Sequence, residues 1–345
     1  MKSAVFMFPA VKGYQANRDY FISMVPLEVI PRIFQFIDED LPPEIRAQRV
    51  LNKARIPEMR DYILENAGNY VFSSLTVSVD GEMTFDSVHA NEPLIGYLTI
   101  PMNARFLIND GQHRRAAIAE ALKHNANLKN EHISVVFFRD MGLTRSQQIF
   151  SDLNRYAIRP TRSINILFNS REESSIIARE VIERVSVFNG FTEKEKTAIS
   201  NRSKALFTLS AICTATELLL HSIELDTEQK IELAVKYWEA VAGHIAEWDA
   251  VKNGKAKASD IRKDYICSLS IALAALGYGG NALIMAHPKM WIKTLSILDQ
   301  IDWRKENKDW QNLVFINGKV SANRATQQAM SKYIRNLFLS SVGDD

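Results

Sequence analysis

The stretch Ile108-Asn109-Asp110-Gly111-Gln112-His113-Arg114-Arg115-Ala116-Ala117-Ile118 joins an apolar run typical of a strand, residues 104–108, to an Ala-rich pattern typical of a helix. A strand that ends at a glycine and continues at once as a helix leaves backbone N–H groups unpaired at the positive end of the helix dipole. Gly111 permits either a backbone with φ above zero or a close approach of the backbone, and Asp110 could cap the helix. The sequence therefore predicts an anion site at this turn, with phosphate as the ligand.

Six residues of the turn are candidates for binding phosphate or a nucleotide. The His and Arg side chains add hydrogen-bond donors within the first helical turn, where they can meet an anion. A well-capped helix whose His and Arg are merely solvated explains the same spacing, so the pattern alone does not decide between the two. The phosphate-binding candidates are Asp110, Gly111, Gln112, His113, Arg114 and Arg115.

The five residues from Asp110 to Arg114 match a family signature. On them the chain resembles the DGQHR-domain family and, in its fuller pattern, the DndB group of DNA sulfur modification proteins. The five-residue signature is fairly specific, whereas the Trp and Asn matches near the end of the chain are individually weak. The other matching stretches span nearly the whole chain and are Phe8-Pro9-Ala10, Tyr20-Phe21, Phe150-Ser151-Asp152-Leu153-Asn154-Arg155, Leu276-Gly277 and Ile301-Asp302-Trp303-Arg304-Lys305-Glu306-Asn307.

This resemblance implies both a fold and a function. Members of the group resemble the ParB and sulfiredoxin fold, whose equivalent strand, turn and helix bind the phosphates of a nucleotide or nucleic acid. The resemblance also implies a regulator of, or an accessory to, the genes that place phosphorothioate in the DNA backbone. The sulfiredoxin signature has a catalytic cysteine where this chain has Gln112. Sulfur chemistry is therefore expected of partner proteins rather than of this chain.

Length and composition indicate a two-domain globular protein. The chain has 345 residues, of which 46% are hydrophobic and 24% charged, so it can bury a large core. A formal charge of +2 means that nucleic-acid contacts must come from local clusters of Lys and Arg. Cys213 and Cys267 have no metal-ligand spacing and lie in apolar runs, which favours buried free thiols and a cytoplasmic location. Neither a secretion signal nor a membrane span is expected.

Strand and helix patterns alternate up to Pro160, and helical periodicity prevails from residue 163 onward. This predicts an α+β protein with a mixed-sheet domain over residues 1–162, which the resemblance makes ParB/sulfiredoxin-like, and a mainly helical domain over residues 163–345. Asp80-Gly81 is a hairpin turn signal between two strands.

The expected helices carry two further predictions. The helix that follows the signature, over residues 112–123, is expected to lie on the sheet through small residues. In the second domain a helix is expected over residues 261–276, followed by a loop at Gly277, Gly279 and Gly280. The inner face of the signature helix is predicted to be Ala116, Ala117, Ala121 and either Ile118 or Leu122.

Two basic segments are candidates for contacts with DNA phosphates. The first surrounds an aromatic ring that could stack on a base, and an ordinary domain linker is its alternative. The second alternates Lys with Glu, so the solvated face and caps of a helical bundle are its alternative. The DNA-binding candidates are Asn154, Arg155, Tyr156, Arg159 and Arg162 in the first segment and Lys194, Lys196, Arg202 and Lys204 in the second.

Two hypotheses of different class follow. The first is a DNA-binding regulator of the phosphorothioate modification system, with double-stranded DNA, other proteins of that system and a second copy of the chain as partners. The second is a ParB-like hydrolase of ATP or another NTP with Mg²⁺, in which Asp110, His113 and Arg114 are catalytic. A nuclease built on the same residues has thinner support. There is no Walker A motif and no clear helix-turn-helix in the sequence.

Overall fold

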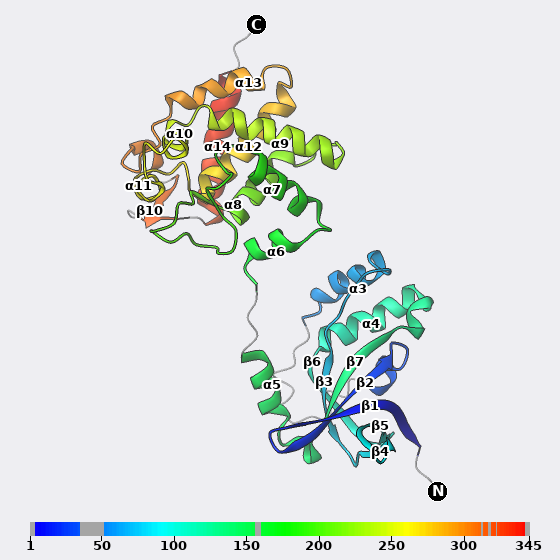
Figure 1. Cartoon of the computed structure of the whole chain (residues 1–345). Helices are drawn as coiled ribbons and strands as arrows, with labels where there is room; N and C mark the ends of the chain where they lie inside the picture. The colour runs from blue at the N-terminus through cyan, green and yellow to red at the C-terminus, as the bar shows by residue number, and fades with distance from the viewer. Residues whose placement is uncertain are drawn as a thin grey trace. The chain divides into compact units, whose positions relative to one another are not determined.

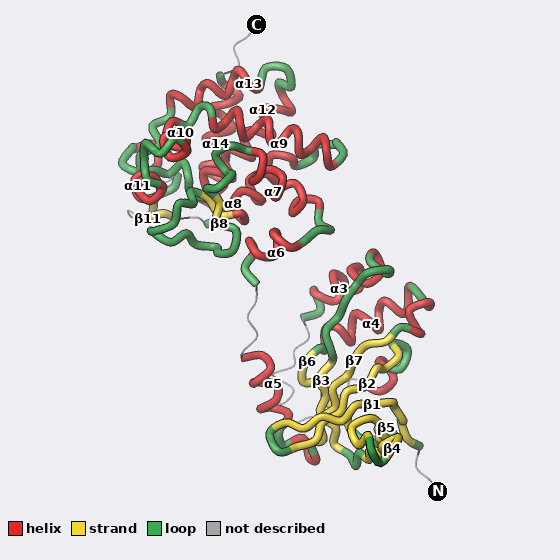
Figure 2. The backbone as a smooth tube through the Cα atoms, in the orientation of Figure 1, coloured by secondary structure: helices red, strands yellow, loops and turns green. Residues whose placement is uncertain are grey.

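In the computed structural model, the described residues are 4–34, 52–155, 160–311, 313–316, 319–321 and 323–341. The chain divides into two compact units, residues 1–158 and 159–345. Strands are concentrated in the first unit and helices in the second (Figure 2). The predicted α+β class is confirmed at this level, and the domain boundary expected after residue 162 stays a prediction.

The first unit is organised around a seven-stranded mixed sheet with the strand order β4-β5-β1-β2-β7-β3-β6 (Figure 1). β3 and β7 pair in parallel, and every other neighbouring pair is antiparallel. The strands are β1 (Val5–Gln15), β2 (Arg18–Pro26), β3 (Leu75–Asp80), β4 (Thr84–His89), β5 (Glu92–Pro101), β6 (Arg105–Asp110) and β7 (His132–Arg139).

Burial along the strands follows the period of two that defines a strand. In β7, Ile133, Val135 and Phe137 are buried, and the residues between them are more exposed. Strand β3, between β7 and β6, is buried on both faces, and its Ser78 hydroxyl accepts a hydrogen bond of 2.7 Å from the Nδ2 group of the buried Asn109. The sheet thus provides a buried core, and its strand β6 ends where the signature helix begins.

The hairpin predicted at Asp80-Gly81 is wrong. β3 pairs with β7 and with the edge strand β6, whereas β4 pairs with β5 at the opposite edge of the sheet. The apolar residues of β3 are fully buried, and most of β4 is exposed. A turn signal describes only the local backbone, while the choice of partner strand depends on which strand can be buried on both faces.

The signature helix α4 (Gln112–His124) lies against the sheet through the small residues that the sequence predicts. Ala116, Ala117 and Ala121 are buried, and of the two alternatives Ile118 is buried and Leu122 is only partly so. Helix α3 (Arg55–Glu65) lies beside α4 (Figure 1). Helix α1 (Ile30–Ile33) also packs on α4, and helix α5 (Ser146–Arg155) packs against β6.

The second unit is a helical bundle with two very short sheets. None of the helices in the described part of the chain is both long and apolar enough to cross a membrane. Both cysteines are buried free thiols, as predicted. The helices are α6 (Arg162–Phe168), α7 (Glu173–Arg184), α8 (Leu209–Leu220), α9 (Thr227–Ala242), α10 (Ala246–Lys252), α11 (Ala258–Asp264), α12 (Ser270–Ala286), α13 (Trp291–Thr294) and α14 (Arg324–Ser340), and the strands are β8 (Thr192–Glu193), β9 (Phe207–Thr208), β10 (Phe315–Ile316) and β11 (Lys319–Val320).

The glycine loop predicted after residue 276 is wrong, because Gly277, Gly279 and Gly280 lie inside α12. A Cβ on Gly277 would come closer than 3.0 Å to the carbonyl oxygen of Ala215 in α8, and one on Gly280 would overlap the ring of Tyr237. The glycines therefore let α12 approach its neighbours closely, a benefit that outweighs their poor helix propensity.

The single helix predicted over residues 261–276 is also wrong, since α11 ends at Asp264 and α12 begins at Ser270. Tyr265 forms a β-bridge with Arg304, and the N–H group of Ile266 donates to the carbonyl of Trp303 at 2.9 Å. These long-range hydrogen bonds take the backbone groups that would otherwise continue the helix.

Candidate functional site

Gly111 forms the turn between β6 and α4. Its backbone is left-handed, with φ 102° and ψ 15°, which is one of the two alternatives that the sequence leaves open. A Cβ at this position would come closer than 3.0 Å to Cδ2 of the buried Leu75 and would also crowd the guanidinium of Arg114. Both the backbone angle and the available space therefore require glycine.

Asp110 does not cap α4, which corrects the prediction. No side chain among the described residues forms an N-terminal cap hydrogen bond on this helix. The Asp110 carboxylate instead pairs with the Arg114 guanidinium at 2.7 Å, one turn along the helix. The pairing draws the carboxylate towards the arginine, and the first-turn N–H groups of α4 keep their dipole without a capping oxygen.

Arg114 is held by the protein more than it is offered to solvent. Its side chain is only 16% exposed, whereas that of Asp110 is 49% exposed. One terminal nitrogen donates to the hydroxyl of Ser73, and the other donates to Asp110. The buried Nε atom makes no hydrogen bond within the described part of the chain. Arg114 thus ties the segment before β3 to the signature turn.

His113 is set up as a neutral imidazole. Its Nε2 atom accepts a hydrogen bond of 3.1 Å from the backbone N–H of Asn52, which leaves the proton on Nδ1. Partial burial lowers the pKa of His113 below its ordinary value, and the positive charge of Arg55 lowers it further. At neutral pH this side chain therefore carries no charge towards an anion, and its one unprotonated nitrogen, Nε2, already accepts the hydrogen bond from Asn52.

The remaining two phosphate-binding candidates, Gln112 and Arg115, are both partly buried. The Gln112 Nε2 group donates to the carbonyl of Ile108 at 3.3 Å, which closes the turn. Arg115 is partly buried, and this burial lowers the pKa of its guanidinium. In the described ranges no group of three or more His, Cys, Asp or Glu side chains is arranged to hold a metal ion. The turn therefore offers backbone N–H groups, one half-exposed carboxylate and a neutral imidazole.

The first basic segment is only partly within the described residues, since Tyr156 and Arg159 lie outside them. Asn154 and Arg155 end α5, and the Asn154 Nδ2 group donates to the carbonyl of Phe150 at 2.8 Å. Because α5 packs against β6, the helix that carries them contacts the strand that leads into the signature.

The start of α6 meets the second basic segment inside the helical unit. The Thr161 hydroxyl donates to the carbonyl of Glu195, and the Ser163 hydroxyl donates to the carbonyl of Lys196 at 3.3 Å. Residues that are more than thirty positions apart, Arg162 and Lys196, are thereby brought to adjoining segments.

The charges of these basic residues are only partly neutralised. Arg162 pairs with Glu217 at 3.2 Å and keeps 54% of its side chain exposed, and Lys194 pairs with Glu183 at 2.6 Å. Exposed ion pairs of this kind are weak, so the cations remain able to exchange a carboxylate for a phosphate.

Arg202 and Lys204 lie on a loop that Arg262 holds in place. The Arg262 guanidinium donates to the carbonyl of Ser200 at 2.8 Å, to that of Ser203 at 3.2 Å and to that of Ala205. The loop is therefore positioned by a residue from α11 that sequence spacing did not connect to it.

A known protein family matches almost the whole chain. The family model described as DndB, DNA-sulfur modification-associated, matches residues 8–340. The chain belongs to the DndB family. No curated protein and no solved structure gives a significant match. The DndB match spans both units, so the signature turn and the helical unit belong to one family architecture.

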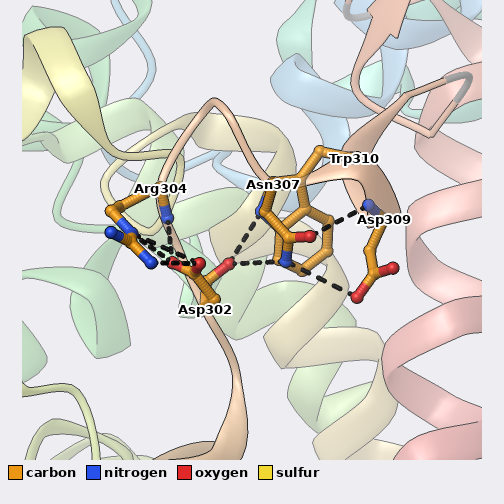
Figure 3. A network of polar contacts seen from close by, with 5 residues as sticks. All are labelled: Asp302, Arg304, Asn307, Asp309 and Trp310. Carbon is orange, nitrogen blue, oxygen red and sulfur yellow. Dashed lines mark hydrogen bonds and ion pairs between the residues drawn. The ribbon is translucent and has the colours of Figure 1, made fainter.

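The family-like stretch from residue 301 to residue 307 is a packing motif in this DndB-family chain (Figure 3). The carbonyl of Asp302 accepts hydrogen bonds from Asn307 Nδ2 at 3.0 Å and from Trp310 Nε1 at 2.9 Å. The Asp302 carboxylate pairs with Arg304 at 2.8 Å. Trp303 and Trp310 are buried and stacked, with ring centroids 5.8 Å apart. These residues hold the segment between α13 and α14 together.

Two kinds of residue that contact the signature or line a pocket were not predicted from the sequence. Ser73 and Asn52 contact the signature from far along the chain, and no local signal could have revealed them. Arg324, Gln327 and Lys332 of α14 line a pocket in the helical unit. Their spacing of three and eight residues, on one helix face, was a signal that could have revealed this lining.

Proposed function

We propose that this chain is a DNA-binding regulator or accessory protein of the DNA phosphorothioate modification system. In this role it acts in the cytoplasm on double-stranded DNA and represses or modulates the modification genes. The observation that carries the proposal is the DndB family match over residues 8–340. Gln112 replaces the catalytic cysteine of the sulfiredoxin signature, which supports regulation of the sulfur chemistry rather than its execution.

The first unit is proposed to be ParB/sulfiredoxin-like. Support comes from its mixed sheet and from the strand, left-handed glycine and helix at β6, Gly111 and α4. In that fold the equivalent turn binds phosphate. The first turn of α4, which has no side-chain cap, is suited to the same ligand by the positive end of the helix dipole.

The helical unit is proposed to contact DNA phosphates with the basic residues around the start of α6. Support comes from the hydrogen bonds that bring residues 161–163 to residues 195–196, where Lys194 and Lys196 lie beside Arg162. Lys and Arg contacts to phosphate position a protein on DNA and carry most of the salt-dependent affinity. Tyr156 and Arg159, outside the described residues, stay predicted members of this surface.

The test measures binding of a duplex from the promoter of the modification genes over a series of salt concentrations. In the Lys194→Gln/Lys196→Gln variant, we expect weaker binding and a slope of log affinity against log salt that is smaller by about one for each lost contact. Lys289→Gln, an exposed change in the same unit, is the matched control. An unchanged slope in the double variant would remove these lysines from the DNA surface, and no duplex binding by the wild type would refute the proposal itself.

A nucleotide hydrolase is the second candidate, favoured by the half-exposed Asp110 and the neutral His113 beside an uncapped helix N-terminus. In this role Asp110, His113 and Arg114 would act on ATP or another NTP with Mg²⁺. Phosphate release is measured for the wild type and for an Asp110→Asn/His113→Gln variant, with circular dichroism as the folding control. Turnover that the folded variant loses supports the hydrolase, and turnover that it keeps places catalysis elsewhere.

A further inference from the structure

The helical unit contains a pocket of about 870 Å³ that the DGQHR signature does not explain. This volume falls within the range of about 300–1,000 Å³ that is common for small-molecule sites. Only three of its fifteen lining residues, Ala211, Leu218 and Ala274, have wholly apolar side chains. Most of the residues that line the pocket therefore carry a polar or charged group, unlike the residues around a gap in the core.

Charge in this pocket has one sign. Arg162, Arg324 and Lys332 line it, and no Asp or Glu is among the lining residues. Arg162 pairs with Glu217 at 3.2 Å, whereas Arg324 and Lys332 form no ion pair with any carboxylate of the described ranges. Unpaired cations that converge on a concave surface attract an anion.

The dipoles of three helices add to the positive electrostatic potential of the pocket. The lining includes first-turn residues of three helices, namely Ser210 of α8, Ser270 of α12 and Arg324 of α14. Each helix is at least twelve residues long, and the positive end of its dipole lies at the pocket. The dipoles support the cations in favouring negative charge, and the hydroxyls of the lining supply further hydrogen-bond donors.

An aromatic ring lies on the same wall. Tyr278 projects from α12, and its side chain is 42% exposed although its helix is otherwise mostly buried. An exposed tyrosine at the edge of a cationic pocket can stack on a planar base. The amides of Gln327 and Gln328 provide both donors and acceptors, which a base edge needs and a bare phosphate does not.

We infer that this pocket binds a nucleotide, with its phosphates on Arg324, Lys332 and Arg162 and its base against Tyr278. The shared chemistry is a phosphate ester that carries a base, and its source is either a free nucleotide or one unit of a DNA strand. The inference does not rest on the proposed regulatory function, and its site is separate in sequence from the signature turn.

The experiment measures binding of ATP, and separately of a short single-stranded oligonucleotide, to the full chain by calorimetry. In Arg324→Gln/Lys332→Gln we expect affinity for the bound probe to fall on the order of tenfold for each cation. Arg335→Gln changes an exposed arginine of the same helix that does not line the pocket, so its affinity should equal that of the wild type. Tyr278→Ala should weaken binding, and Tyr278→Phe should restore it.

The two probes distinguish a free nucleotide from a DNA strand as the source of the ligand. Binding of ATP that the oligonucleotide does not displace identifies a free nucleotide as the ligand, and tight binding of the oligonucleotide alone identifies a DNA strand. The inference is overturned if the wild type binds neither probe. It is also overturned if binding is unchanged in the Arg324→Gln/Lys332→Gln variant and is lost only in Asp110→Asn/His113→Gln, because the nucleotide would then occupy the signature turn.

Discussion

Replacing Gly111 by alanine tests how tightly the signature turn is built. A residue other than glycine in a left-handed backbone costs roughly 1–2 kcal/mol, and Gly111 has φ 102°. The added Cβ would also overlap Leu75, which is fully buried, and overpacking of a core costs about 1–3 kcal/mol. We therefore expect Gly111→Ala to lower the free energy of unfolding of the first unit by about 2–5 kcal/mol, a large part of the total for a typical domain.

Two glycines of the same unit separate these contributions. Gly142 has φ 68°, and a Cβ there would lie 3.7 Å from its nearest neighbour, so Gly142→Ala should carry only the backbone cost. Gly68 has no positive φ and open space around it, so Gly68→Ala should be stabilising by about 0.4–1 kcal/mol. Combining Gly111→Ala with Leu75→Ala should remove the overlap, which makes the two changes non-additive by about 1–3 kcal/mol.

The assay must report on the two units separately. All five tryptophans lie between residues 238 and 310, so tryptophan fluorescence during urea unfolding follows the helical unit alone. Hydrogen exchange of peptides from β3, β6 and α4 follows the first unit. We expect faster exchange in Gly111→Ala with an unchanged fluorescence transition. A cost no greater than that of Gly142→Ala, or full additivity with Leu75→Ala, would refute the overlap with Leu75.

Three further predictions concern stability. Gly277→Ala should destabilise the helical unit by about 3 kcal/mol or more, seen as an earlier fluorescence transition in urea, because the added Cβ would overlap the carbonyl of Ala215. His113 has a lowered pKa in the folded state, so the unfolded state binds its proton first, and stability should fall as pH drops below about 6.5; the wild type should lose more stability on acidification than His113→Gln, and equal losses would contradict this. Asn307→Ala removes the hydrogen bond to Asp302 and should cost about 1–2 kcal/mol in urea unfolding, while Lys308→Ala should be neutral.

Several elements could be predicted because their signals are local. The alanine stripe of α4 marks the face that this helix buries, and it was predicted correctly. Gly111 was predicted to allow either a positive φ or a close backbone approach, and its φ is 102°. The predicted aspartate cap is wrong, because Gly111 occupies the N-cap position and the Asp110 carboxylate pairs with Arg114, one helical turn away.

Only the tertiary structure decided which residues that are distant in the chain contact one another. The sequence by itself determined the DndB family, the α+β class and the position of the signature turn. It did not determine that β3 lies between β7 and β6, that Gly277 lies within a helix, or that Arg162 and Arg324 line one pocket. Each of these depends on contacts between residues that are distant in the chain, whose free energy outweighs the local preference for a turn or a loop.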